Sequence, residues 1–107
     1  MDLFAPQTYA GLRRPLLEAE TLPTQCYLSE EFYRREVDTI FMKGWNLLGR
    51  VDYVKQPGDY FTRTLVGISL IIMRGADRKS RAFVNACRHR GTMRLEGAGQ
   101  VDCVRCP

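Results

Sequence analysis

Two strand-like runs joined by a Val-Gly pair constrain the fold of this chain more than any other feature of its sequence. The runs are residues 60–65 (YFTRTL) and 68–74 (ISLIIMR), with Val66 and Gly67 between them. A two-residue connection that contains glycine is typical of a tight turn between antiparallel strands. The apolar stretch at 68–73 is far shorter than the roughly 20 residues of a membrane span and suits a buried strand. The pattern predicts a β-hairpin.

The β-type pattern extends to both sides of this hairpin. The sequence QPGD at 56–59 predicts a turn, because proline presets φ and glycine accepts a positive φ. The polar sequence GADRKS at 75–80 predicts a loop. Further strands are predicted at 45–51, at 81–86 leading into Cys87, and at 100–104 leading towards Cys106. We therefore expect a mainly β fold.

The N-terminal part of the chain has a different character. Residues 1–28 contain Pro6, Pro15 and Pro23 and show no sustained period, which predicts an extended, weakly ordered arm. Ser29 is a typical N-cap, and an apolar face recurs with helical spacing after it. A helix is predicted over 30–43, with Gly44 as a left-handed stop. The predicted division is an arm (1–28), a helix (29–44) and a β domain (45–107).

Composition excludes several classes of protein. The chain has 107 residues, enough for one small domain, and 45% hydrophobic and 26% charged residues, as in ordinary globular proteins. The net charge of +4 is spread along the chain without a basic stripe interleaved with aromatic residues, so we expect no nucleic-acid partner. The sequence shows neither a secretory leader nor a membrane span. We expect a cytoplasmic protein.

Cysteines gather near the only histidine. Of the four cysteines, Cys87, Cys103 and Cys106 lie in the last part of the chain, and a reducing compartment favours metal binding over disulfides. On an extended backbone Cys87 and His89 face one side, so the thiolate and the imidazole can both bind iron or zinc. The alternatives are an unremarkable thiol beside a surface histidine, or a zinc site of three cysteines and one histidine that includes Cys103. By default we expect Cys103 to be a strand residue that packs inward.

The stretches FVNACRHRG and CVRCP resemble, in order and spacing, the Rieske [2Fe–2S] signature of Cys-x-His followed by Cys-x-x-His. The resemblance implies that Cys87 and Cys106 bind one iron and that His89 binds the other. A second histidine would lie two residues past Pro107, so the resemblance implies a Rieske-type antiparallel fold that is incomplete at the C-terminus. Imidazole ligands in place of thiolates raise the reduction potential of such a cluster. Arg88, Arg90 and Arg94 would add positive potential, and N–H groups at 89–91 could donate to cluster sulfurs.

The order of segments resembles the start of the large subunit of a Rieske non-haem iron oxygenase. An arm precedes YLSEEFYRREVDTIFMKGW and PGDYFTRTLVGISLIIMRG, whereas a Rieske ferredoxin would begin close to its first strand. The resemblance implies a mono- or dioxygenase of the ring-hydroxylating or choline/carnitine group, with electrons supplied by a reductase or ferredoxin. It also implies a mononuclear Fe(II) in a domain absent from this chain, so the chain alone would not be catalytic. The complete protein would be a homo-oligomer, commonly a trimer. The alternatives are a stand-alone Rieske-type ferredoxin and the zinc module.

Overall fold

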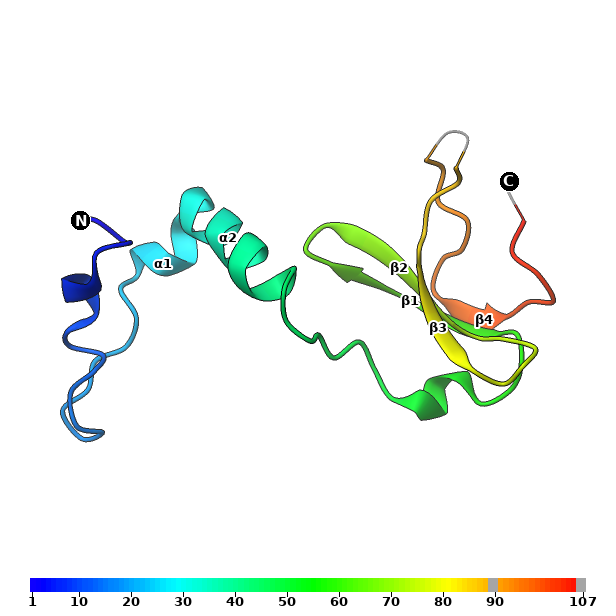
Figure 1. Cartoon of the computed structure of the whole chain (residues 1–107), viewed down its shortest axis with the longest axis horizontal. Coiled ribbons are helices and arrows are strands. Elements are labelled where there is room, and N and C mark those ends of the chain that lie inside the picture. Colours follow the sequence, from blue (N-terminus) through cyan, green and yellow to red (C-terminus); the bar gives the residue numbers. More distant parts are fainter. Residues whose placement is uncertain (89–90, 106–107) are drawn as a thin grey trace. The chain divides into compact units, whose positions relative to one another are not determined.

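The chain divides into two compact units, Met1–Asn46 and Leu47–Pro107 (Figure 1). The computed structural model describes residues 1–88 and 91–105. Among those residues, none of the helices combines the length and the apolar character needed to cross a lipid bilayer.

The N-terminal unit is helical. It contains a 3₁₀ helix, η1 (Pro6–Tyr9), and two α-helices, α1 (Gln25–Leu28) and α2 (Glu30–Glu36), the second of which continues into a π-helical segment, η2 (Val37–Phe41). The expectation of an extended arm is therefore wrong at η1 and α1. In η1 a proline occupies the start of the helix, where its missing N–H has no intrahelical partner to lose.

Helix α2 begins where the sequence predicts and ends in a different way. The Ser29 side chain accepts a hydrogen bond from the Phe32 N–H at 3.1 Å, which confirms the N-cap. The predicted stop at Gly44 is wrong, because Gly44 has no positive φ. Its N–H donates instead to the Ile40 carbonyl at 2.8 Å, just after the wider π-helical turns of η2. The chain thus leaves the helix without a left-handed residue.

A few side-chain contacts hold the N-terminal unit together. The rings of Phe4 and Phe32 stack with centroids 6.2 Å apart, and the Arg35 guanidinium lies 4.9 Å above the Phe4 ring. Cys26 of α1 is buried, with its Sγ 3.6 Å from the Tyr9 hydroxyl. These contacts tie η1 and the first residues to the two α-helices.

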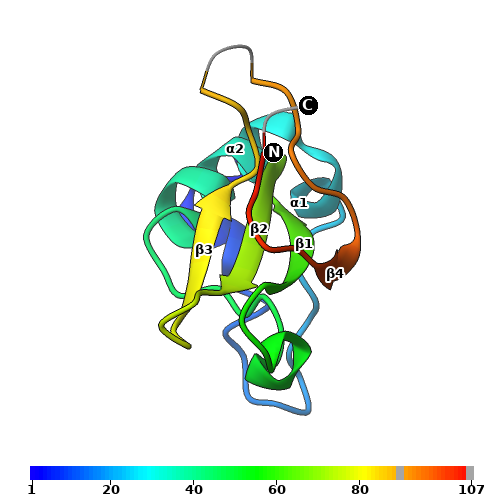
Figure 2. The same cartoon turned by 90° about the vertical axis from the view of Figure 1, so that its right-hand side faces the viewer.

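The second unit is built on a four-stranded antiparallel sheet with the order β3-β2-β1-β4 (Figure 2). Its strands are β1 (Asp59–Leu65), β2 (Ile68–Arg74), β3 (Ser80–Val84) and β4 (Ala98–Gln100). The predicted hairpin is confirmed: Leu65 pairs with Ile68, and Val66 and Gly67 have φ values of 44° and 82°. The predicted turn before β1 is also confirmed, because Gly58 has φ 90° and the Asp59 N–H donates to the Gln56 carbonyl at 3.0 Å. The antiparallel β fold is as the sequence predicts.

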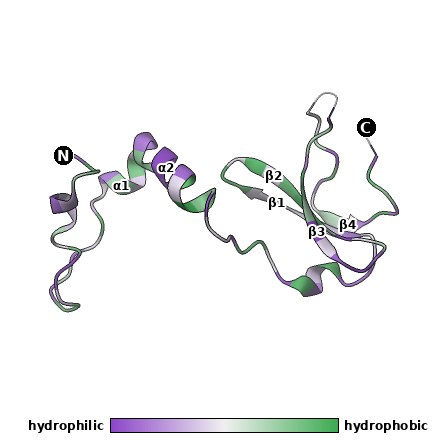
Figure 3. Ribbon diagram, viewed as in Figure 1, coloured by the Kyte–Doolittle hydropathy of each residue, from purple (hydrophilic) through white to green (hydrophobic). Residues whose placement is uncertain are grey.

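The core of this unit lies where β1 and β2 meet a short 3₁₀ helix, η3 (Val51–Val54). Val54, Phe61 and Ile71 are buried there, and the hydrophobic residues of β2 are visible in Figure 3. The Tyr53 ring meets Phe61 edge-on at 5.6 Å. Arg74 fixes the end of η3 by donating from Nε to the Val54 carbonyl at 2.8 Å.

Two predicted strands differ in position from the structure, and the strand predicted at 81–86 is observed at Ser80–Val84, so it ends two residues early. Residues 45–50 are in neither helix nor strand, and 51–54 form η3, so the strand predicted at 45–51 is wrong. A strand needs a partner for its backbone groups, and none of the described strands pairs with this segment. The strand predicted at 100–104 lies earlier, at Ala98–Gln100, because only these residues pair with β1.

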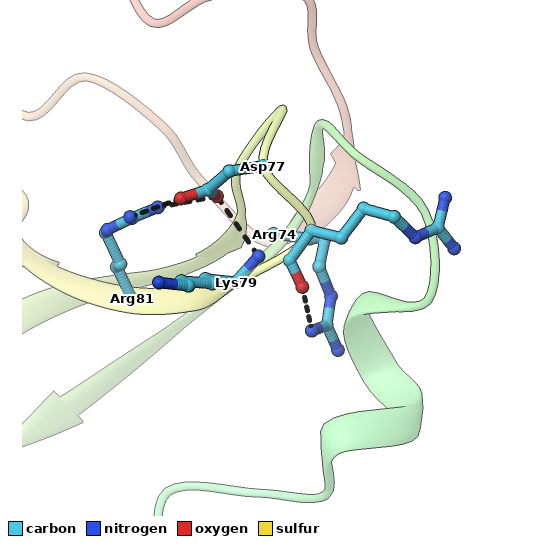
Figure 4. Close-up of polar contacts among 5 residues, drawn as sticks. Arg74, Asp77, Lys79 and Arg81 are labelled. Atoms are coloured by element: carbon cyan, nitrogen blue, oxygen red, sulfur yellow. Dashed lines mark hydrogen bonds and ion pairs between the residues drawn. The ribbon is translucent and has the colours of Figure 1, made fainter.

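The connection between β2 and β3 is tied together by polar contacts (Figure 4). Asp77 accepts two hydrogen bonds from the Arg81 guanidinium, at 2.9 and 2.6 Å, and one from the Lys79 N–H at 3.1 Å. Arg74 donates from Nη1 to the Arg78 carbonyl at 2.7 Å. This loop brings β3 back along β2 and so directs the chain toward Cys87.

Candidate metal centre

Cys87 lies just beyond the sheet. β3 ends at Val84, and the next N–H, that of Asn85, still donates to the Ser69 carbonyl of β2 at 2.8 Å. Cys87 follows two residues later and is 3% exposed. A buried thiol at the end of a paired strand is held in place by its backbone, as a metal ligand must be.

The loop that begins at Cys87 is closed by main-chain hydrogen bonds. The Cys87 N–H donates to the Thr92 carbonyl at 2.8 Å, and the Gly91 N–H donates to the Cys87 carbonyl at 2.7 Å. Gly91 has φ 67°, a left-handed value that favours glycine. A Cβ at Gly91 would meet no described protein atom within 4 Å, so within the chain itself it is the backbone conformation that requires glycine here. The Gly91 N–H closes the loop, and the expectation that N–H groups at 89–91 donate to cluster sulfurs stays a prediction.

The two other predicted ligands, His89 and Cys106, lie outside the described residues. Among the described residues there is no group of three histidine, cysteine, aspartate or glutamate side chains that could hold a metal ion. Of the three predicted ligands, Cys87 is the one that lies within the described residues.

Cys103 differs from the sequence prediction. It is exposed rather than packed inward, and it follows β4 instead of lying within a strand. The Arg105 Nε lies 3.4 Å from its sulfur. The chain reaches this segment directly from the sheet, since the Val101 N–H donates to the Gly58 carbonyl at 3.0 Å.

A surface cavity brings together residues from both cysteine-bearing segments. Ala86 and Arg88, which flank Cys87, line it together with Arg94 and Val104. The Arg94 Nε is buried, and among the described residues it has no hydrogen-bond acceptor. A buried N–H without an acceptor is costly unless another group supplies one. The cavity therefore offers positive charge and an unused donor beside the Cys87 loop.

These features fit an iron–sulfur group. The predicted donors, two thiolates and one imidazole, are ligands that suit such clusters. Cys87 is shielded from bulk water, and the positive charges of Arg88 and Arg94, which line the neighbouring cavity, favour a negatively charged group.

Comparison with known families decides the classification. The sequence model of the Rieske [2Fe-2S] domain matches residues 44–107. The chain belongs to the Rieske [2Fe-2S] domain family. The Rieske match begins at Gly44, close to the boundary after Asn46 between the two compact units.

Curated relatives of this Rieske protein are oxygenases. It is 40% identical over 96 residues to the chloroplastic choline monooxygenase of Atriplex hortensis, covering 87% of this chain and 22% of the relative. It is 38% identical over 90 residues to the carnitine monooxygenase oxygenase subunit of Acinetobacter baumannii, covering 83% of this chain and 24% of the relative. The Rieske chain thus spans about a quarter of the length of these relatives or less.

Solved structures agree with this grouping. The quaternary ammonium Rieske monooxygenase CntA in complex with L-carnitine superposes with a TM-score of 0.78 at 38% identity, over 83% of this chain and 26% of that one. Naphthalene 1,2-dioxygenase with indole bound in its active site superposes with a TM-score of 0.67 at 35% identity, over 71% of this chain and 17% of that one. The antiparallel sheet of this Rieske protein is therefore the one found in Rieske oxygenases.

Asn85 is a buried residue beside the candidate site that the sequence pattern did not predict. It is 4% exposed, two residues before Cys87. The signal that could have found it is an amide side chain in an otherwise apolar run, FVNAC, where a buried polar group needs a specific partner.

Proposed function

We propose that this chain is the electron-accepting part of the oxygenase subunit of a Rieske non-haem iron oxygenase. The observation that carries the proposal is the extent of the similarity. The match to choline monooxygenase covers 87% of the chain and so reaches beyond residues 44–107 into the helical N-terminal unit. A stand-alone Rieske ferredoxin, the second candidate, would be expected to share only the β domain.

The residues of the chain have separate roles in this proposal. Cys87 and Cys106 bind one iron as thiolates, and His89 binds the other through a neutral ring nitrogen. When bound, the [2Fe–2S] cluster supplies reversible uptake of one electron. Arg88 and Arg94 stabilise the extra negative charge of the reduced state, because both residues line the cavity beside the Cys87 loop.

The activity proposed for the whole protein is supported by its relatives and extends beyond this chain. We propose that a reductase or ferredoxin delivers the electrons and that a mononuclear Fe(II) site outside these 107 residues uses them with O2 to hydroxylate a substrate. The relatives named for choline and carnitine favour a quaternary ammonium substrate over an aromatic ring. A homotrimer and a cytoplasmic location are part of the same proposal.

Replacement of Cys87 tests the ligand assignment. In the full-length protein, Cys87→Ser is expected to abolish the Rieske EPR signal and the acid-labile sulfide, because one iron loses a thiolate ligand. The matched control is Cys103→Ser, which removes an exposed thiol from the same unit and is expected to leave both signals intact. Equal loss in both variants, or zinc without sulfide in the wild type, would reject the assignment and favour the zinc module with Cys103.

Iron content separates the oxygenase from the ferredoxin. The oxygenase proposal predicts a third iron atom per full-length chain in addition to the pair in the cluster, and O2 consumption that depends on a substrate and an electron donor. A full-length chain that binds only the two cluster irons and reduces no O2 would instead establish the electron carrier.

A further inference from the structure

Asn85 lies where the chain leaves the sheet. Among the described residues, Asn85 is the one polar residue that is buried, with 4% of its surface exposed. Its backbone N–H still pairs with the Ser69 carbonyl at 2.8 Å, while Val84 before it is the last residue of β3. Its carboxamide therefore lies where the loop that carries Cys87 leaves the sheet.

The loop has an outgoing arm, residues 85–88, and a returning arm, residues 91–95. The carboxamide contacts the returning arm. Its Oδ1 accepts hydrogen bonds from the Arg94 N–H at 2.9 Å and the Leu95 N–H at 3.2 Å. Its Nδ2 donates to the Leu95 carbonyl at 2.7 Å and to the Ser69 Oγ at 3.1 Å. One side chain thus joins β2, the outgoing arm and the returning arm.

Only an amide in this orientation satisfies all the partners. The two backbone N–H groups require an acceptor and the Leu95 carbonyl requires a donor, so the assignment of Oδ1 and Nδ2 follows from the contacts. Removal of the carboxamide would leave three backbone groups of the returning arm without these bonds, and each such group is costly when buried.

The same contacts act on Cys87. Main-chain hydrogen bonds close the loop at Cys87, among them the one from the Cys87 N–H to the Thr92 carbonyl at 2.8 Å, and Asn85 adds a side-chain link two residues earlier. The side-chain link lies on the sheet side of the main-chain links, so it holds the two arms together between the sheet and Cys87. Asn85 therefore helps to hold the backbone that carries Cys87.

We propose that Asn85 is a positioning residue for the [2Fe–2S] cluster, acting through the arms of the Cys87 loop. The inference rests on the proposed function only in requiring that Cys87 binds the cluster. It assigns Asn85 a role in how tightly and in what geometry the cluster is held, in addition to any role in folding.

The test compares three variants of the full-length protein. Asn85→Leu removes the carboxamide at similar volume. Asn85→Asp keeps the two acceptor bonds and replaces the donor to the Leu95 carbonyl by a carboxylate oxygen, so it provides a second readout if the leucine variant does not fold. The matched control is Asn46→Leu, which removes an amide that donates to the Phe41 carbonyl at 2.9 Å in the other unit.

The measurements are the EPR g-values of the reduced cluster, the rate of iron loss to a chelator, and the thermal midpoint. Both Asn85 variants are expected to shift the g-values and to release iron about tenfold faster than wild type, a change typical of lost supporting contacts at metal sites. Asn46→Leu is expected to keep wild-type g-values and release rate even where its thermal midpoint falls.

The outcomes separate a positioning role from a purely structural one. Folded Asn85 variants with a lower thermal midpoint but wild-type g-values and release rate would overturn the positioning role and leave only the structural one. If Asn85→Leu does not fold, the g-values and release rate of the aspartate variant distinguish the two roles in the same way. A wild-type protein without a Rieske signal would reject the proposed function itself, so the two failures remain distinct.

Discussion

At the scale of single residues, Asp77 shows how a polar side chain shapes the route to the site. Its carboxylate receives both Nη groups of Arg81 and the Lys79 N–H, within the connection from β2 to β3. These contacts lower the pKa of Asp77 from 3.8 to about 2, with the Arg81 hydrogen bonds as the largest cause and the Lys79 backbone bond next. The charged form is therefore favoured in the folded chain.

The lowered pKa of Asp77 predicts a pH dependence of stability. A carboxyl whose folded pKa lies below its unfolded value stabilises the fold above the unfolded pKa, and this contribution is lost as the pH falls from about 4 to about 2. Asp77→Asn is expected to be less stable than wild type at pH 7, with the difference shrinking through that window. Urea unfolding of both proteins at several pH values measures it. A difference that stays constant down to pH 2 would contradict the prediction.

At the scale of elements, the β1–β2 hairpin contains a strained position. Val66 has φ 44°, a left-handed value that is unfavourable for a β-branched residue, whereas Gly67 at φ 82° is not strained. The preferred sequence for such a two-residue turn is Asn-Gly.

Val66→Asn is therefore expected to stabilise the sheet. Relief of the left-handed strain is worth about 1 kcal/mol, which denaturant unfolding resolves as a higher midpoint at unchanged slope. The control is Thr64→Asn in β1, which introduces the same side chain on an extended backbone and should give no gain. A lower midpoint for Val66→Asn would show that packing of the valine outweighs the strain.

Local signals explain which elements could be predicted from sequence. The Ser29 cap and the Val-Gly turn act within a few residues, so the start of α2 and the hairpin follow from the sequence alone. The strand predicted at 45–51 failed because pairing depends on a distant partner, which composition does not reveal. The predicted end of the helix at Gly44 was wrong because the π-helical turns of η2 widen its last part, and no residue type signals that change.

At the scale of the whole molecule, the segment that connects α2 to the sheet has strongly exposed side chains. Trp45 is 105% exposed and Leu47 is 95% exposed, and residues 45–50 are in neither helix nor strand. Loops of this kind are the preferred sites of proteolytic cleavage.

Limited chymotrypsin digestion of this chain is expected to cut first after Trp45 or Leu47. Phe61 provides an internal comparison, because it is 4% exposed in β1 and should be cut only after unfolding. Mass spectrometry of early fragments identifies the order. Simultaneous cleavage at Trp45 and Phe61 would mean that the sheet is no better protected than the connecting segment.

The surroundings of the candidate site were partly predictable from the sequence, and the ligand assignment stays a prediction. The Cys-x-His spacing after a predicted strand led to Cys87, because alternation along a strand is a local rule. Asn85 was missed because its partners, Arg94 and Leu95, come from a returning arm whose path depends on the loop closure at Gly91. The inward packing expected of Cys103 was wrong because β4 ends at Gln100.

The open side of β3 has a consequence for handling the protein. Every residue of this strand is exposed, Phe83 and Val84 among them, and within the described residues it pairs only with β2. Its outward amide and carbonyl groups are a template on which a strand from another molecule could add, and Arg81 is the one charge on the strand that opposes such stacking. At high concentration this chain should therefore tend towards edge-to-edge self-association. A low protein concentration, or a partner that covers β3, should prevent aggregation.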